Sequence, residues 1–123
     1  MRGGFKVVSL LKARADIDRT RFRDYYETRH APLILELMPN ILGYRRNYVA
    51  ADGGIAFDGA PPFDYDSVTE IWFRDRAAYD EALAVLMQPA NAARLAADEE
   101  EFLDRSQTRL MIVEETESAI RSV

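Results

Sequence analysis

Four stretches of the chain have the apolar, β-branched character of strands. Residues 5–12 (FKVVSLLK) carry apolar side chains on both alternating faces, which predicts a strand that is buried on both faces. Similar patterns predict three more strands, of which the last is again apolar on both faces; they cover about residues 41–50, 66–73 and 108–116.

Two segments have the three- and four-residue apolar spacing of amphipathic helices. The first extends to Met38 with Asp16 or Asp18 as its N-cap, and its apolar stripe consists of Phe22, Tyr26, His30, Leu33 and Leu37. Pro39 and Asn40 end this helix. The second segment, residues 75–104, is rich in alanine and is split by Pro89.

The predicted order of elements, β-α-β-β-α-β, is the ferredoxin-like pattern of an α+β domain. It implies a four-stranded antiparallel sheet with helices on one face. Because the first and last strands are apolar on both faces, the bare face needs a cover, and in so short a chain a second copy supplies it. We therefore expect one domain over residues 1–116, a frayed tail over 117–123, and a homodimer in which two sheets pack face to face as a dimeric α+β barrel.

The segment between the second and third strands is predicted to be a long loop. Residues 51–64 (ADGGIAFDGAPPFD) hold three of the six glycines and two of the five prolines. Loops of this length are usually functional lids or mobile segments. Since Ile55, Phe57 and Phe63 are costly to leave in water, we expect some of them to cover another part of the protein.

Composition narrows the classes of function. The 123 residues are 48% hydrophobic and 30% charged with a net charge of −5, which fits a globular domain and argues against a basic nucleic-acid-binding surface. No apolar run reaches the length of a membrane span, and the start lacks a signal-peptide pattern, so we expect a cytoplasmic protein. The lack of cysteine excludes disulfides and thiolate metal sites, and a single histidine excludes a multi-histidine metal site in one chain. We expect neither a metal nor another cofactor.

His30 is the first candidate for chemistry, because an ordinary imidazole has a pKa of about 6.5 and can move a proton at neutral pH. It follows Tyr26 by four residues, so the two side chains can meet on one helix face. The alternative is a structural histidine of the core, bound to a backbone carbonyl or to Tyr26. Pro32 removes a helical hydrogen bond, and we expect a kink just after His30 that leaves the carbonyl of Thr28 free.

Aromatic and polar residues can line a cavity between the sheet and the helices. A flat aromatic ligand suits such a lining, for which the candidates are Phe22, Tyr26, Tyr44, Tyr48 and Trp72. Asn47 and Glu70 lie on central strands and need partners, but alternation alone leaves open whether they face the dimer seam or a pocket on the helix side. Glu27 and His30 have the i, i+3 spacing of a carboxylate-bridged metal site; such sites need a second pair, so no metal is expected.

Residues 22–49 (FRDYYETRHAPLILELMPNILGYRRNYV) resemble the EthD family of the dimeric α+β-barrel superfamily. The shared features are Tyr-x-x-x-His-Ala-Pro-Leu, then Pro-x-x-x-Gly-Tyr, and an Asn on the next strand. Residues 66–73 (DSVTEIWF) and 97–104 (ADEEEFLD) are similar to the family's third strand and to its segment before the last strand. The resemblance covers most of the domain and implies the same fold and dimerisation. It also implies that Asp98 or Asp104 reaches a backbone amide or the mouth of a pocket.

The resemblance limits function only loosely, because relatives include an accessory protein of ether degradation and dehydratases, and the superfamily includes cofactor-free monooxygenases and polyketide cyclases. The first hypothesis is a small cofactor-independent enzyme for an aromatic or polyketide-like molecule. His30, positioned by Tyr26, is its general acid or base, and the residues that orient the substrate are Tyr44, Asn47 and Trp72. The reaction is a dehydration, cyclisation, isomerisation or metal-free oxygenation. The alternative is a non-catalytic binding or accessory protein, and a purely structural dimer predicts no ligand-sized cavity.

Overall fold

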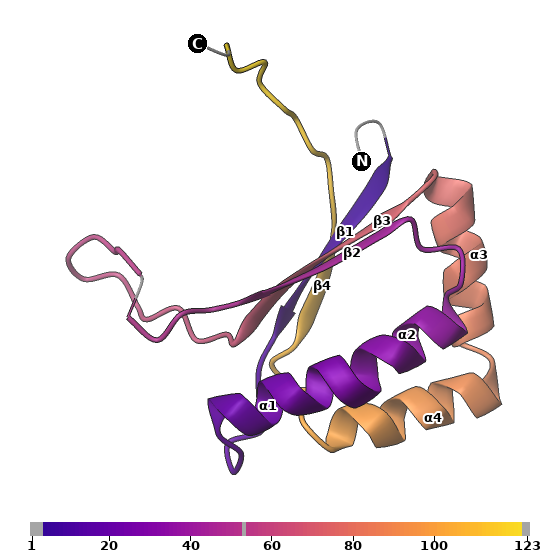
Figure 1. Ribbon diagram of the computed structural model, residues 1–123, viewed down its shortest axis with the longest axis horizontal. Coiled ribbons are helices and arrows are strands. Elements are labelled where there is room, and N and C mark those ends of the chain that lie inside the picture. Colours follow the sequence, from indigo (N-terminus) through magenta and orange to yellow (C-terminus); the bar gives the residue numbers. More distant parts are fainter. Residues whose placement is uncertain (1–3, 53, 122–123) are drawn as a thin grey trace.

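Four strands form one antiparallel sheet in the computed structural model, which describes residues 4–52 and 54–121 (Figure 1). The order across the sheet is β2-β3-β1-β4, and the strands are β1 (Phe5–Leu11), β2 (Gly43–Tyr48), β3 (Ser67–Phe73) and β4 (Arg109–Val113). Each strand is somewhat shorter than its predicted range. The element types, their order and the antiparallel pairing confirm the predicted ferredoxin-like α+β class.

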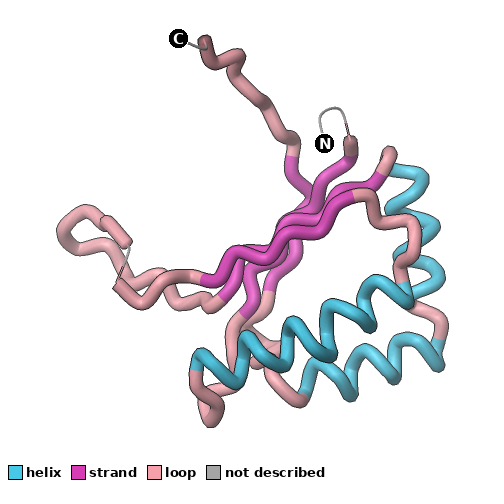
Figure 2. Tube along the Cα trace, viewed as in Figure 1, coloured by secondary structure: helices cyan, strands magenta, loops and turns pink. Residues whose placement is uncertain are grey.

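Helices cover one face of this sheet (Figure 2). One helical run consists of α1 (Arg19–Tyr25), the π-helical turn η1 (Tyr26–His30) and α2 (Ala31–Leu37), and the later helices are α3 (Arg76–Leu86) and α4 (Pro89–Glu100). Asp18 is the N-cap of α1, and its side chain accepts the N–H of Arg21 at 2.8 Å. Pro89 lies at the start of α4 and divides the alanine-rich segment as predicted.

The π turn of the first helical run was not predicted from the sequence. The N–H of Ala31 donates to the carbonyl of Tyr26, five residues earlier. One extra residue in a turn rotates the following side chains by about 100°, so Ile34 continues the buried stripe in place of the predicted Leu33. Pro32, which has no N–H to donate, follows this turn directly. The irregularity therefore lies before the proline, not just after His30 where we expected a kink.

The helix side of the sheet carries two apolar clusters with polar side chains between them. One cluster packs β1 and β3 against α2 and α3, and the other packs the end of β1 against α1, η1 and the segment after α4. Between the clusters the register aligns Ser9, Thr69 and Arg46 across β1, β3 and β2. Because Tyr26 bonds to Thr69, this polar row lies beneath η1.

Among the described residues, no helix lies over the opposite face of the sheet, which is called here the open face (Figure 2). Lys6 is buried at one end of this face, where its Nζ lies 3.0 Å from Glu70 and 2.7 Å from Glu115, above the ring of Trp72. Beyond these charges the centre of the face is apolar and only partly buried; it is formed by Val8, Leu10, Val68 and Met111, and Asn47 and Arg109 flank it on the outer strands.

Two segments project beyond the sheet (Figure 1). The predicted loop, described over residues 51–52 and 54–64, leaves the body beyond β2 and β3, and within one chain Ile55, Phe57 and Phe63 are exposed rather than covering anything. Residues 114–121 continue from β4 without helix or strand, while residues 122 and 123 of the predicted tail lie outside the described chain. Within the described ranges, no helix is long and apolar enough to cross a bilayer.

Candidate functional site

His30 forms a buried hydrogen-bonded pair with an aspartate from a distant helix. Nδ1 of His30, at the end of η1, lies 2.5 Å from Oδ2 of Asp98 on α4, and the two side chains are 6% and 10% exposed. The hydroxyl of Tyr25 donates to Oδ1 of Asp98 at 3.1 Å. Since an ionised carboxylate only accepts hydrogen bonds, this geometry assigns the proton of the neutral imidazole to Nδ1.

The other ring nitrogen of His30 remains available. Nε2 forms no hydrogen bond among the described residues, yet it is not one of their fully buried polar atoms that lack a partner. This nitrogen is therefore not completely enclosed, although the His30 residue as a whole is only 5% exposed. Phe102, completely buried after α4, lies against the ring with a centroid distance of 4.9 Å and limits its movement.

Tyr26 contacts the imidazole, but its hydroxyl is bound to the sheet. The rings of Tyr26 and His30 meet edge to face with centroids 5.0 Å apart, as their spacing predicted. The Tyr26 hydroxyl lies 2.7 Å from that of Thr69 and accepts the Tyr44 hydroxyl at 3.3 Å. Burial raises the pKa of Tyr26 and of Tyr44, so both phenols stay neutral. Tyr26 therefore anchors η1 to β3 and supports the imidazole through its ring.

Glu27 is committed to an ion pair and does not converge with His30. Arg46 binds its carboxylate with two hydrogen bonds of 3.0 and 2.7 Å, and the Tyr48 hydroxyl donates to it as well. The guanidinium lowers the pKa of Glu27 to about 2. Among the described residues no group of three His, Asp or Glu side chains has a metal-binding arrangement.

The sheet separates the predicted binding residues into two groups. The first group lies on the helix side with His30 and consists of Phe22, Tyr26 and Tyr44.

The second group lies on the open face with Lys6 and includes Glu70 and Trp72. Asn47 belongs to this group, because its amide donates to the Val68 carbonyl at 2.8 Å and to Glu70 at 3.4 Å. Within one chain, the group formed by Asn47, Glu70 and Trp72 cannot contact a molecule held at His30.

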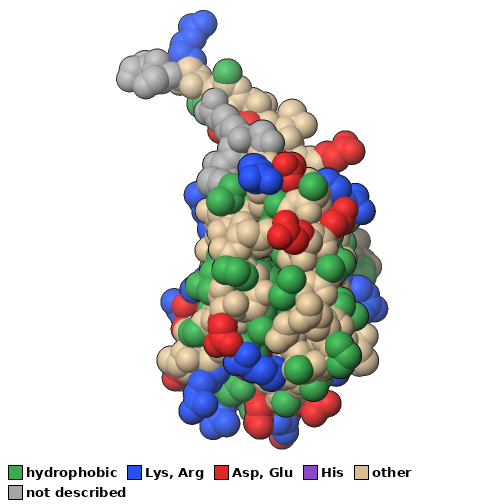
Figure 3. All heavy atoms as spheres, turned by 90° about the vertical axis from the view of Figure 1, so that its right-hand side faces the viewer, with side chains coloured by type: hydrophobic (Ala, Val, Ile, Leu, Met, Phe, Trp, Pro, Cys, Tyr) green, Lys and Arg blue, Asp and Glu red, His purple; other side chains and the backbone are tan. Residues whose placement is uncertain are grey.

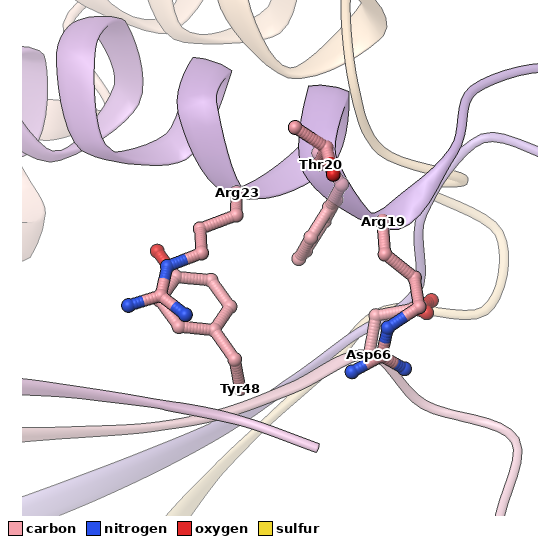
Figure 4. A pocket seen from close by; sticks show the side chains of 6 residues that line it. Arg19, Thr20, Arg23, Tyr48 and Asp66 are labelled. Atoms are coloured by element: carbon pink, nitrogen blue, oxygen red, sulfur yellow. The ribbon is translucent and has the colours of Figure 1, made fainter. Parts of the chain in front are cut away.

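Two hollows lie elsewhere on the described part of the protein, and His30 lines neither of them. One, of about 180 Å³, lies between α1 and the end of β2, where Arg23 is stacked 4.7 Å from the ring centroid of Tyr48 and Phe22 forms a wall (Figure 4). The second, of about 370 Å³, lies between α2 and α3 and is mostly apolar. Its lining includes Leu37, Leu42, Ala82 and Val85, with Arg74 and Glu81 among its polar members.

Sequence reasoning missed two residues that hold the histidine–aspartate pair, namely Tyr25 and Phe102. Tyr25 lies outside the predicted apolar stripe, although the aromatic Tyr25-Tyr26 pair is a visible signal. Burial and the Asp98 charge raise the pKa of Tyr25 to about 12, so its phenol remains a donor at neutral pH. Glu99 lies beside this site, and burial raises the pKa of its carboxyl.

Solved structures with the same architecture are similar over nearly the whole chain. An EthD family protein from Bacillus halodurans is 19% identical, with 92% of this chain and 99% of that one aligned at a TM-score of 0.63. An EthD-like protein from Ralstonia eutropha is 20% identical over 90% and 91% of the two chains, with a TM-score of 0.62. SnoaB from Streptomyces nogalater, a cofactor-independent oxygenase, is 13% identical over 94% and 95%, with a TM-score of 0.60. No curated protein matches the chain in a sequence search.

The sheet order and the covering helices define a small α+β protein with a ferredoxin-like fold. The EthD domain model matches residues 14–106, a range that includes both His30 and Asp98. This chain therefore belongs to the EthD family, as the His-Ala-Pro-Leu resemblance predicted.

Proposed function

We propose that this protein is a cofactor-independent enzyme that moves a proton on an aromatic or polyketide-like hydrophobic molecule, with His30 as the general base. The observation that carries the proposal is the buried Nδ1–Asp98 contact of 2.5 Å, which orients the ring, while Nε2 has no hydrogen-bond partner among the described residues. The similarity of fold to SnoaB, a cofactor-independent oxygenase, supports a reaction of this class.

Each neighbour of the imidazole has a part in this mechanism. Nε2 takes a proton from an acidic carbon or a phenolic hydroxyl of the substrate, and the Asp98 carboxylate stabilises the imidazolium that forms. Tyr25 holds Asp98, and Phe102 holds the ring plane. Return of the proton elsewhere on the substrate gives isomerisation, its delivery to a leaving hydroxyl gives dehydration, and the carbanion can also close a ring or react with oxygen.

An activity assay tests this proposal. It measures turnover of a panel of hydroxyaromatic and β-polyketone compounds with a chelator present and no added cofactor. His30→Gln is expected to lower kcat by about 100-fold or more, the usual contribution of a positioned general base. Leu35→Gln, on the exposed side of α2, is the matched control and should keep full activity. Full turnover by folded His30→Gln on a substrate that the wild type converts would remove His30 from the mechanism.

The open face supports the second part of the proposal, a homodimer with two sheets facing each other. Its apolar centre is partly exposed in one chain, and a structurally similar protein from Bacteroides fragilis, 12% identical with a TM-score of 0.53, is described as dimeric. The free energy from burying an apolar face is proportional to its area. Sedimentation of the wild type across a range of concentrations measures this association directly.

A non-catalytic binding protein is the second candidate, and the apolar hollow between α2 and α3 favours it. Its volume of about 370 Å³ falls in the range of small-molecule sites, and no histidine lines it. It lies on the α3 side, where hydrophobic side chains are interspersed with charged ones (Figure 3). Val85→Trp, which fills the hollow, should abolish binding of a carried molecule, whereas Leu83→Trp on the same helix should not. If binding depends on His30 and not on Val85, the carrier function has no site in this hollow.

A further inference from the structure

We propose that residues 54–64 form an intersubunit arm, whose Ile55 and Phe57 are buried by a second copy of the chain against that copy's edge strand β4. This inference rests on the homodimer proposed above and says which segment holds it together. Residues 54–64 are called the arm below.

The arm carries apolar side chains that its own chain does not cover. Ile55 and Phe57 are 101% and 93% exposed, and Phe63 is also exposed. The arm leaves the sheet beyond β2 and β3 and points away from the helices (Figures 1 and 2). Large apolar side chains held this far from the body of the molecule are typical of contacts with another molecule.

The arm is shaped before any partner arrives. The N–H of Ala60 donates to the carbonyl of Phe57 at 3.0 Å and closes a turn, in which Gly59 has a φ of +83° that side chains rarely adopt. Pro61 and Pro62 follow and restrict the backbone further. At the base, Lys12 binds Asp64 at 2.6 Å and ties the arm to the end of β1. Such preorganisation reduces the entropy lost on association.

The open face is a small platform for a dimer. Its four strands lie about 4.8 Å apart and are five to seven residues long at about 3.3 Å per residue, so its flat outline covers roughly 400 Å². Apolar side chains that project beyond this outline add to the area that a partner can bury.

Strand β4 offers the receiving surface. Leu110 and Ile112 are in register with Ser9 and Val7, which are buried on the helix side, so both side chains point to that side. They are nevertheless 54% and 46% exposed, because the helices do not cover this edge. A simple sheet-to-sheet contact does not reach them, since it involves the other face.

The order of the strands places the arm of one copy close to Leu110 and Ile112 of the other copy. A two-fold axis parallel to the strands reverses the order β2-β3-β1-β4, so β2 of one copy lies over β4 of the other. The arm starts beyond the Tyr48–Ser67 end of β2 and β3, and Arg109 begins β4 at the same end of the sheet. Charge is also complementary, because the arm carries Asp58 while β4 begins with Arg109.

Sedimentation equilibrium of full-length variants tests the arm. Phe57→Ser is expected to raise the dimer dissociation constant at least about tenfold. Leu110→Ser should do the same, and the double variant should be little weaker than either single variant because the two side chains share one contact. Leu35→Ser, with a side chain 47% exposed on α2, is the control for loss of an exposed leucine and should leave the constant unchanged.

The possible outcomes distinguish a failure of the arm proposal from a failure of the homodimer proposal. A wild type that is dimeric while Phe57→Ser keeps the same constant overturns the arm and leaves the homodimer standing. Strictly additive effects of Phe57→Ser and Leu110→Ser overturn β4 as the receiving surface. A wild type that stays monomeric at every concentration removes the homodimer and the arm together. Circular dichroism of each variant checks that the fold is retained.

Discussion

Replacing Asp98 by asparagine should remove the preference of the His30 imidazole for the tautomer with its proton on Nδ1. In the wild type, the carboxylate of Asp98 can only accept, so the neutral His30 ring must carry its proton on Nδ1 to keep the 2.5 Å contact. An asparagine amide has both a donor and an acceptor, so a 180° rotation of the amide group lets it hydrogen-bond to either tautomer. The substitution therefore changes the direction of the hydrogen bond without changing the shape of the site.

The size of the effect follows from the burial of the pair. A hydrogen bond to a charged partner contributes about 1.5–3 kcal/mol, and both side chains here are at most 10% exposed, so solvent competes little. At about 1.4 kcal/mol per factor of ten, Asp98 favours the Nδ1–H tautomer by roughly ten- to a hundredfold. We expect Asp98→Asn to bring the two tautomers within a few-fold of each other.

Long-range proton–nitrogen correlation spectra measure this ratio without any substrate. His30 is the single histidine of the chain, so only two ring nitrogens contribute signals. Asp104→Asn is the matched control, because Asp104 lies in the same acidic segment but binds Ser106 and Gln107 instead. A wild-type ring protonated mainly on Nε2, or spectra of Asp98→Asn identical to those of the wild type, would refute the role of Asp98 and with it the free base at Nε2.

Two further predictions concern stability. The pKa of Glu27 is lowered from 4.5 to about 2 by Arg46, so the unfolded chain binds the proton first, and the stabilisation is complete above about pH 4.5 and lost as the pH falls toward 2. With the Glu27 side chain 37% exposed, we expect screening to reduce this loss to about 1 kcal/mol, measured by urea unfolding at pH 5 and pH 3 and absent in Glu27→Gln. Phe102→Ala should cost about 3–5 kcal/mol because the ring is fully buried, whereas Leu35→Ala should cost less than about 1 kcal/mol in the same assay.

The fold was predictable because its signals are local and repeated. β1 and β4 were predicted because their sequences carry apolar side chains on both alternating faces. Two helix boundaries were predicted from the N-cap at Asp18 and from the proline at the start of α4. The π turn was not predictable from periodicity, because a search for apolar residues at 3.6-residue spacing presupposes a regular α-helix throughout the segment. Its one-residue insertion explains why Ile34 is buried in place of the predicted Leu33, while the predicted Leu37 is buried together with Met38.

The site was predictable only in part, for a geometric reason. His30 and Tyr26 share one helix, so their contact follows from spacing. The resemblance to the EthD family left Asp98 and Asp104 as alternatives at a backbone amide or a pocket mouth, and the hydrogen bond between Asp98 and His30 was not predicted. Alternation assigns Glu70 and Trp72 to one face of β3 but cannot say which face the helices cover. That choice depends on long-range packing, which places both residues with Lys6 on the open face, away from the imidazole.

The sheet therefore divides the molecule into two regions that should respond independently to mutation. The histidine–aspartate pair lies under the helices, while the arm and the apolar centre of the open face lie beyond the strands. Distant sites without shared partners usually give additive effects. Phe57→Ser should weaken association yet leave the tautomer of His30 unchanged, and Asp98→Asn should do the reverse. If loss of the dimer also shifts the tautomer, the partner copy contributes to the environment of the imidazole, and catalysis depends on assembly.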